Sequence, residues 1–273
     1  EAAGELMIDS TGNTLEAGGF PMLWWPRYSG PVVNFPLRGI RSGWGEYEGA
    51  IVETTWDFFS LAGWQRPDGW DLTFDVDGYS ERGIGGGIDW EIETDGNSMA
   101  MDLYGIKDSG TQRTDTGISM DVPEDYRYAA LWQQTIKLSE SWLFQGQFSY
   151  ISDSTYISAW REDDYRERRE YETSLYLKRE SRNTAFTVIG KYALNDFISN
   201  SWLIASQGYQ VNKLPELSYM RFGDSLFGDL LTWSSQYNAS RMQIVIPDGT
   251  PANSGLRTST FTNPDGSPFG ENE

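Results

Sequence analysis

Apolar and polar residues alternate with a period of two along most of this chain. In residues 70–77 the apolar side chains take the even positions, and Asp71, Thr73, Asp75 and Asp77 take the odd positions. Successive side chains of an extended strand point to opposite faces, so this run predicts a strand with one apolar and one acidic face. About ten runs of about 8–13 residues share the pattern, and none has a convincing helical period. The sequence therefore predicts an all-β fold built as an antiparallel meander.

Polar connections of two kinds join these runs. The Asp95-Gly96 pair suits the positive φ angles of a tight hairpin turn, and residues 139–141 form a second tight connection. Residues 107–125 and 152–169 form long polar connections instead. The other runs with strand character are residues 84–92, 99–103, 126–138, 142–150, 173–179, 185–193, 214–222 and 226–237.

The alternation of short and long connections is typical of an outer-membrane β-barrel. Such a barrel joins tilted strands of about 9–11 residues by short periplasmic turns and long outer loops. Aromatic residues near the ends of the runs fit its interfacial girdles. These residues are Trp70, Tyr79, Trp90, Tyr126, Tyr128, Trp142 and Tyr150. Aromatic-rich alternating strands also build soluble antiparallel sandwiches, although these show less of the asymmetry in connection length, so a sandwich is the alternative architecture.

Composition excludes several classes of function. The chain has no cysteine and no histidine, which excludes disulfides, thiolate nucleophiles, imidazole bases and the most common metal ligand. Its formal net charge of −19 repels a phosphate backbone, so we expect no nucleic acid as a partner. No uncharged apolar stretch approaches the roughly 18 residues of a membrane-spanning helix. Because the chain begins at Glu1, we expect a processed chain or an excised segment. We also expect no cofactor and no bound metal.

Several short motifs resemble those of one family, in the family's order. Residues 79–83 resemble a Y-x-x-R-G turn, and residues 148–156 resemble a D-y-v-S-D-x-x-Y hairpin end. Residues 20–28, 70–74, 88–91 and 214–217 are similar to further stretches of the same family. Together these motifs resemble the lipopolysaccharide-assembly outer-membrane proteins, the LptD or organic-solvent-tolerance family, from residue 20 to residue 238.

The resemblance implies part of a transmembrane outer-membrane β-barrel, preceded by the end of a periplasmic β-jelly-roll. Residues 1–37 would be the jelly-roll end and linker, residues 38–246 the barrel strands, and residues 247–273 a loop or disordered tail. The implied function is a translocon rather than an enzyme, which passes lipopolysaccharide through the barrel lumen and a lateral gate to the outer leaflet. The implied partners are lipopolysaccharide, outer-membrane lipid, an LptE-like plug lipoprotein and an LptA-like periplasmic bridge protein.

Two sets of residues take roles in this interpretation. Charges are costly in lipid, so the acidic strand faces should point into the lumen. In the family, prolines weaken the first two strands and let a lateral gate open. Here Pro36 precedes the first strand, the second proline is missing from residues 54–59, and glycines either loosen the pairing or form a bulge or turn. The lumen-facing set is Asp71, Asp75, Asp77, Asp89, Glu91 and Glu93, and the gate set is Pro36, Gly39, Gly43, Gly45 and Gly49.

A soluble β-sandwich that binds or hydrolyses carbohydrate is the alternative function. Paired carboxylates perform acid–base chemistry without histidine, and exposed tryptophans act as sugar platforms. The mixed-charge residues 162–170 are expected to form a hydrated outer loop, with a self-associating polar extension of the strands as the alternative. The candidate carboxylates are Asp89, Glu91, Glu162, Asp163 and Asp164, and the candidate platforms are Trp24, Trp25, Trp56 and Trp64.

Overall fold

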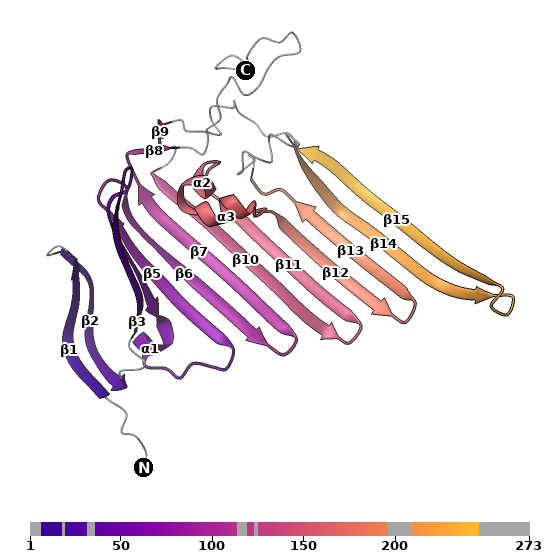
Figure 1. Cartoon of the computed structure of the whole chain (residues 1–273), viewed down its shortest axis with the longest axis horizontal. Helices are drawn as coiled ribbons and strands as arrows, with labels where there is room; N and C mark the ends of the chain where they lie inside the picture. Colours follow the sequence, from indigo (N-terminus) through magenta and orange to yellow (C-terminus); the bar gives the residue numbers. More distant parts are fainter. Residues whose placement is uncertain are drawn as a thin grey trace, which may run out of the picture.

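One antiparallel sheet of eleven strands dominates the computed structural model, which describes residues 7–17, 20–31, 36–113, 119–122, 125–195 and 209–245. Its strands are β3 (Leu37–Gly45), β4 (Gly49–Asp57), β5 (Trp70–Tyr79), β6 (Gly83–Thr94), β7 (Asn97–Asp108), β10 (Tyr126–Ser139), β11 (Trp142–Ile151), β12 (Thr173–Ser181), β13 (Thr184–Tyr192), β14 (Gln210–Leu226) and β15 (Leu231–Val245). They follow one another across the sheet in chain order, with β3 and β15 at its two ends (Figure 1). The predicted all-β antiparallel meander is confirmed.

The register of β5 against β6 confirms the predicted alternation. Asp71 lies opposite Glu91, and Trp70 lies opposite Ile92. Because residues directly opposite each other in a ladder share a face, the acidic residues gather on one side of the sheet and the apolar residues on the other. The side that carries Asp71 and Glu91 is called the polar face below, and the side that carries Trp70 and Ile92 the apolar face.

The connections differ between the two edges of the sheet at which the strands end (Figure 1). Two-residue turns join β6 to β7, β10 to β11 and β12 to β13 at one edge, the turn edge. Gly96 in the first of these has φ +86°, as its Asp-Gly pair predicts. The opposite edge, the loop edge, carries the long connections 109–125, 152–172 and 193–209, together with the short turns 46–48 and 80–82.

Two small hairpins accompany the large sheet. β1 (Met7–Ala17) and β2 (Phe20–Pro31) form one two-stranded sheet, which lies beside β3 (Figure 1). β8 (Thr111–Arg113) and β9 (Ser119–Asp121) form another within the long connection from β7 to β10. Whether the first hairpin ends a jelly-roll stays a prediction.

Three short helices were not predicted from the sequence. α1 (Phe58–Ala62) follows β4, whereas α2 (Tyr156–Trp160) and α3 (Glu162–Glu167) lie in the connection from β11 to β12. Asp57 ends β4 and caps α1 by accepting a hydrogen bond from the Ser60 amide at 2.7 Å, so residues 54–59 are not one continuous strand. Helices of five or six residues are too short to show a 3.6-residue period. No helix in the described ranges has the length and apolar character needed to cross a membrane.

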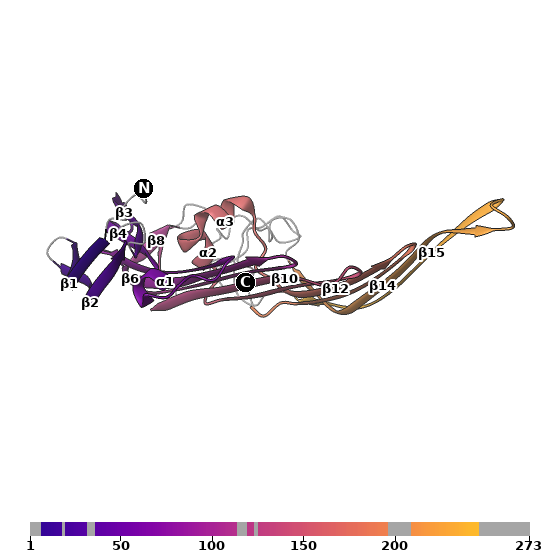
Figure 2. The ribbon, with the colours of Figure 1, turned by 90° about the horizontal axis from the view of Figure 1, so that it is seen from below.

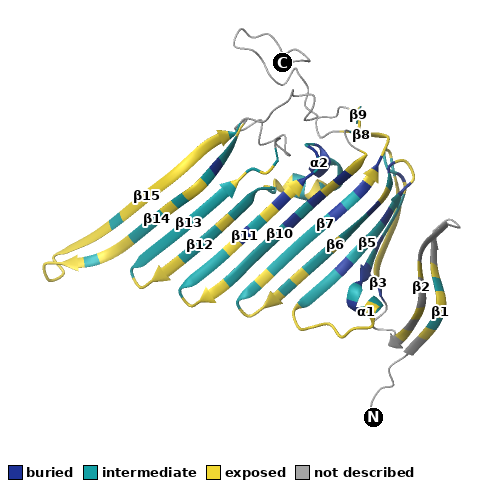
Figure 3. Cartoon of the chain, turned by 180° about the vertical axis from the view of Figure 1, so that it is seen from behind, coloured by how far each residue is buried: buried dark blue, intermediate teal, exposed yellow. Residues whose placement is uncertain are grey.

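The core lies at the loop edge, between the polar face and α2. Its buried apolar residues come from β5, β7, β10, β11 and α2, and Figure 3 shows burial concentrated toward the loop edge of β7 and β10. The helices α2 and α3 lie on one side of the sheet, and β3 and β4 curl toward that same side (Figure 2). The buried set is Tyr79, Tyr104, Ile106, Ala129, Ile151, Tyr156 and Ile157.

Candidate functional site: the polar face and the loop that covers it

The six acidic residues predicted to share a strand face lie on the polar face. Asp71 is opposite Glu91 across β5 and β6, and Asp89 is opposite Asp102 across β6 and β7. Asp102 was not among the predicted residues, although its place in the alternation of residues 99–104 gave the signal for it. The shared face is confirmed, whereas the direction of this face in a barrel stays a prediction.

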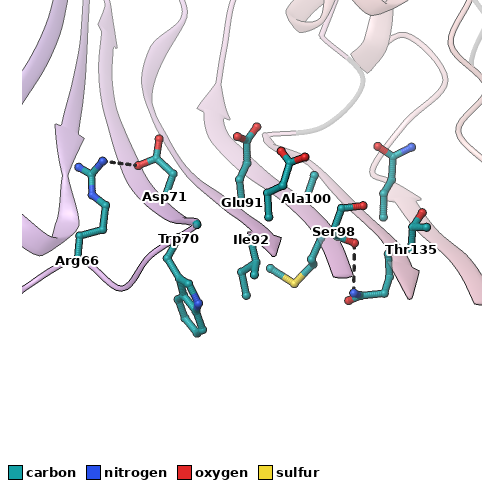
Figure 4. A pocket seen from close by; sticks show the side chains of 13 residues that line it. Arg66, Trp70, Asp71, Glu91, Ile92, Ser98, Ala100 and Thr135 are labelled. Atoms are coloured by element: carbon teal, nitrogen blue, oxygen red, sulfur yellow. Dashed lines mark hydrogen bonds and ion pairs between the residues drawn. The ribbon is translucent and has the colours of Figure 1, made fainter. Parts of the chain in front are cut away.

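Figure 4 shows the alternation in a groove of about 620 Å³ near the turn edge. Asp71 and Glu91 point to one side of the sheet, and Trp70 and Ile92 point to the other. Carboxylates, amides and hydroxyls line its polar side, including Glu93, Ser98, Gln133 and Thr135. This combination of donors and acceptors favours a hydrated or saccharide-like ligand, or a polar protein surface.

Two arginines hold the carboxylates at the turn edge of β4 and β5. Arg38 donates to Asp57 at 2.8 Å from Nε and to Asp71 at 2.7 Å from Nη1. Arg66 also pairs with Asp57, and its Nη1 lies 3.6 Å from Asp71. The acidic row is thus partly neutralised at the end that lies next to β3.

A buried ionic network occupies the loop edge of the polar face. Arg82 donates to Asp108 at 2.7 and 2.6 Å, and Arg127 donates to the same carboxylate at 2.9 Å. Arg127 also forms a two-bond fork with Asp153, at 2.8 and 2.9 Å. The side chain of Arg127 is 0% exposed. The two arginines and the two aspartates neutralise each other, and a buried charge without such a partner would be costly.

The network joins the covering loop to the strands. Gln112 of β8 accepts from Arg127 at 2.7 Å and donates to Thr155 at 2.7 Å. The indole of Trp160 in α2 donates to Asp108 at 3.0 Å, and the Arg82 guanidinium lies 4.8 Å from the centre of the Trp160 ring. The turn between β5 and β6, the strands β7, β8 and β10, and the helix α2 therefore meet at one set of charges.

Asp153 is ionised in this setting. Burial by itself would raise the pKa of its carboxyl group, but hydrogen bonds and charge from Arg127, together with the Thr155 and Ser152 hydroxyls, hold the pKa below the ordinary value for aspartate. The ionised carboxylate of Asp153 is the form that pairs with Arg127 and holds the loop on the sheet. Arg82 and Asp153 belong to motifs quoted for the family resemblance, whereas Arg127 and Asp108 were missed because no local pattern marks them.

Residues 162–170, predicted to form a hydrated outer loop or a polar strand extension, begin with the helix α3 and lie in a segment that contacts the sheet. Arg161 pairs with Asp102 of the polar face, and Arg169 donates to Gln133 of β10 at 2.8 Å. Arg169 also pairs with Asp164 at 3.1 Å. Since these side chains find partners on the sheet, the segment folds back over the polar face instead of extending into solvent.

The predicted gate residues have different local roles. Pro36 is buried, and its carbonyl accepts from the Asp57 amide at 2.6 Å. Gly39 and Gly43 lie on β3 with open space where a Cβ atom would be. Gly49 has φ +69° at the β3–β4 turn, so the backbone of the turn requires glycine there. Gly45 is crowded by Glu48 of the same turn.

Three of the carboxylates proposed for a carbohydrate function, Glu162, Asp163 and Asp164, line one pocket of about 560 Å³, whereas Glu91 lines the groove near the turn edge. Trp56 is 0% exposed and stacks on Phe74 at 6.5 Å, so its expected role as a sugar platform is wrong. Trp64 and Trp24 are exposed, at 65% and 63%, whereas the side chain of Trp25 lies outside the described residues. Asp164 of α3 is held by Arg169 and by the Tyr171 hydroxyl.

Comparisons with known proteins add no family to this description. No protein-family model matches the chain. No curated protein matches it either. Among the described residues, no group of three or more acidic side chains is arranged to hold a metal ion.

Proposed function

We propose that this chain forms part of an outer-membrane β-barrel that passes lipopolysaccharide to the outer leaflet. The observation that carries the proposal is the division of an eleven-stranded antiparallel meander into an exposed apolar face and a polar face with buried ion pairs. A sheet that has one hydrocarbon-facing and one lumenal side requires this division on every strand. An apolar surface of this extent needs a partner, and lipid is a partner of the right chemistry.

The apolar face supports the proposal by its aromatic residues. On β11, Trp142 lies at the turn edge and Tyr150 at the loop edge, eight residues apart. This separation is about 26 Å along a strand. For a strand tilted by about 40°, it corresponds to about 20 Å along the membrane normal, which is close to the height of about 25 Å of the apolar band of a membrane barrel. Neighbouring rings reinforce both bands, because Trp70 and Trp90 lie 5.3 Å apart and Tyr128 and Tyr150 lie 6.0 Å apart.

The loops support an orientation. The connections 109–125, 152–172 and 193–209 lie at the loop edge and three two-residue turns at the turn edge, which fits the asymmetry of outer loops and periplasmic turns, although residues 58–69 form a longer connection at the turn edge. In this orientation α2 and α3 lie inside the barrel near its outer mouth. β1 and β2 then lie toward the periplasm, where an LptA-like bridge protein would deliver lipopolysaccharide, and the groove of Figure 4 faces an LptE-like plug lipoprotein.

The end of the sheet formed by β3, called the seam below, is the proposed lateral exit. β3 is an end strand of the sheet, and three of its nine residues are glycines. Glycine in a strand interior weakens the strand because it packs no side chain and loses more entropy on ordering. Gly39 and Gly43 thus replace the proline of the family's second strand as the element that weakens the seam.

The first test is refolding with and without an amphiphile. We expect sheet structure, measured by circular dichroism, and protection from protease only when lipid vesicles or detergent micelles are present. Aggregation of the chain in plain buffer agrees with this expectation. A monomeric chain that unfolds cooperatively in buffer alone would reject the barrel, and the carbohydrate-active sandwich would then be the function to test, starting from Trp24 and Trp64.

A further inference from the structure

A shallow apolar groove of about 510 Å³ crosses β6, β7 and β10 on the apolar face. Its floor is flat because Gly86 and Gly105 lie directly opposite each other, with no side chain to fill the space between their neighbours. Apolar side chains form most of the rest of its lining, including Phe74, Ile88, Leu103, Tyr128 and Ala130, and Asp75 also lines it. A groove of this shape fits an extended hydrocarbon chain.

A lysine stands at the loop-edge end of the groove. Lys107 lies two residues from Gly105 on β7, and its side chain is on the same face. It is exposed, and its ammonium lies 6.0 Å from the centre of the Tyr126 ring. Among the residues that the structure describes, no carboxylate lies within ion-pair distance of Lys107. This cation is therefore available to an anionic group at the membrane surface.

Three tyrosines surround the same end of the groove. Tyr126 is opposite Lys107, Tyr128 is opposite Gly105, and Tyr150 stacks on Tyr128 with ring centres 6.0 Å apart. All three are exposed, Tyr126 by 65%. Tyrosine offers an apolar ring face and a hydroxyl, which suits contact with a sugar ring at a membrane interface.

We propose that this surface binds a phosphorylated glycolipid from the outside of the barrel. One acyl chain lies in the groove, a phosphate contacts Lys107, and a sugar ring packs on Tyr126 and Tyr128. The choice of a glycolipid rests on the proposed function, because the loop edge then lies at the outer leaflet. The proposal goes beyond that function, since Lys107 lies on β7, four strands across the sheet from the proposed exit at β3.

The same face contains a second groove that serves as a control. It measures about 470 Å³ and is lined by Leu175, Val188, Gly190, Leu214 and neighbouring apolar residues, with no lysine or arginine in its lining. Hydrocarbon can enter both grooves, but the cations lie at opposite edges of the sheet. Lys107 lies beyond the loop-edge end of the first groove, whereas Arg179, two residues from Leu177, lies beyond the turn-edge end of the second. A specific glycolipid should therefore depend on the first groove and not on the second.

The test measures lipid retention by the protein in detergent micelles, using native mass spectrometry. The probe is lipid A, compared with its dephosphorylated form and with phosphatidylglycerol. Lys107→Gln removes the charge, and Gly105→Leu fills the groove at a position where a Cβ atom meets its nearest neighbour at 3.7 Å. Gly190→Leu fills the second groove, where the nearest atom is at 3.9 Å. Arg179→Gln removes a cation near Trp142, toward the turn edge of the same face.

We expect Lys107→Gln and Gly105→Leu each to lower the affinity for lipid A by about tenfold, the size of one charge-assisted contact. Gly190→Leu and Arg179→Gln should leave it within about twofold, and dephosphorylated lipid A should bind the native protein as weakly as lipid A binds Lys107→Gln. Equal affinity for the native protein and Lys107→Gln, or equal retention of phosphatidylglycerol, would overturn the proposal. Insertion into vesicles is measured separately by protease protection, so that failure of the barrel and failure of this site give different results.

Discussion

Arg127 of β10 holds Asp153 of the following loop by two parallel hydrogen bonds, 2.8 and 2.9 Å long. The residues are 26 positions apart, and the contact is buried on the polar face. The contact joins β10 to the start of the loop, three residues before α2 begins at Tyr156. The fork thus helps to hold residues 152–172 over the polar face.

Removing the charge of Asp153 should release the loop. Asp153→Asn keeps the shape of the side chain but leaves Arg127 without half of its buried charge partners, which typically costs about 3–5 kcal/mol. We expect rapid proteolysis within residues 152–172 and a lower free energy of unfolding in denaturant. Glu162→Gln is the matched control, because its pair with Arg166 is exposed and such pairs contribute about 0–1 kcal/mol. Similar effects of both substitutions would contradict the role assigned to the fork.

The loop should also open in acid. Because the pKa of Asp153 is lower in the folded protein than its ordinary value near 3.8, its ionisation stabilises the closed loop above about pH 4. This contribution is lost as the pH falls through the lowered folded pKa. Protection of the α2 amides from hydrogen exchange, measured relative to the intrinsic exchange rate at each pH, should therefore stay high at pH 5 and fall only below about pH 4. In Asp153→Asn the acid-dependent step should be missing, and an unchanged step would assign it to another group.

Charge on the apolar face should impair insertion. Phe148→Arg places a cation where the proposal puts lipid, at a cost of up to about 2–4 kcal/mol near the bilayer centre. Gln145→Arg is the control on the same strand, since Gln145 lies on the polar face. We expect a smaller protease-protected fraction in vesicles for Phe148→Arg and little change for Gln145→Arg. Equal insertion of both variants would count against a lipid-facing apolar side.

Stiffening β3 should block lipopolysaccharide delivery if the seam is the exit. Gly39→Val with Gly43→Val adds β-branched side chains at two positions with open space, so the strand gains order without a clash. We expect less lipopolysaccharide at the cell surface, measured by antibody labelling in cells that depend on the full-length protein. Gly190→Val on β13 is the control, because it also replaces a strand glycine by valine but lies away from the seam, and it should leave delivery unchanged. Gly49 is avoided, because its positive φ would strain any other residue.

The alternating pattern predicted the nine strands of the large sheet from β5 to β15, together with their two faces and most of their hairpins. These features are local, because a strand with period two chooses its faces from its own residues and a turn such as Asp95-Gly96 depends on its own φ angles. The acidic row from Asp71 to Glu93 is the clearest example. The alternation alone places these acidic residues on one face of their strands, whichever strands pair with each other.

Contacts between distant segments could not be predicted in this way. Arg82, Asp108, Arg127 and Asp153 come from four separate segments, and the strand register together with the folded loop brings them together. Trp56 is buried although its local pattern did not distinguish it from the exposed Trp64. The sequence by itself determined which side of each strand is polar, because that choice depends on neighbours along the chain. Only the tertiary structure decided which charges are buried together and which part of the polar face is covered, because these depend on packing between segments far apart in the sequence.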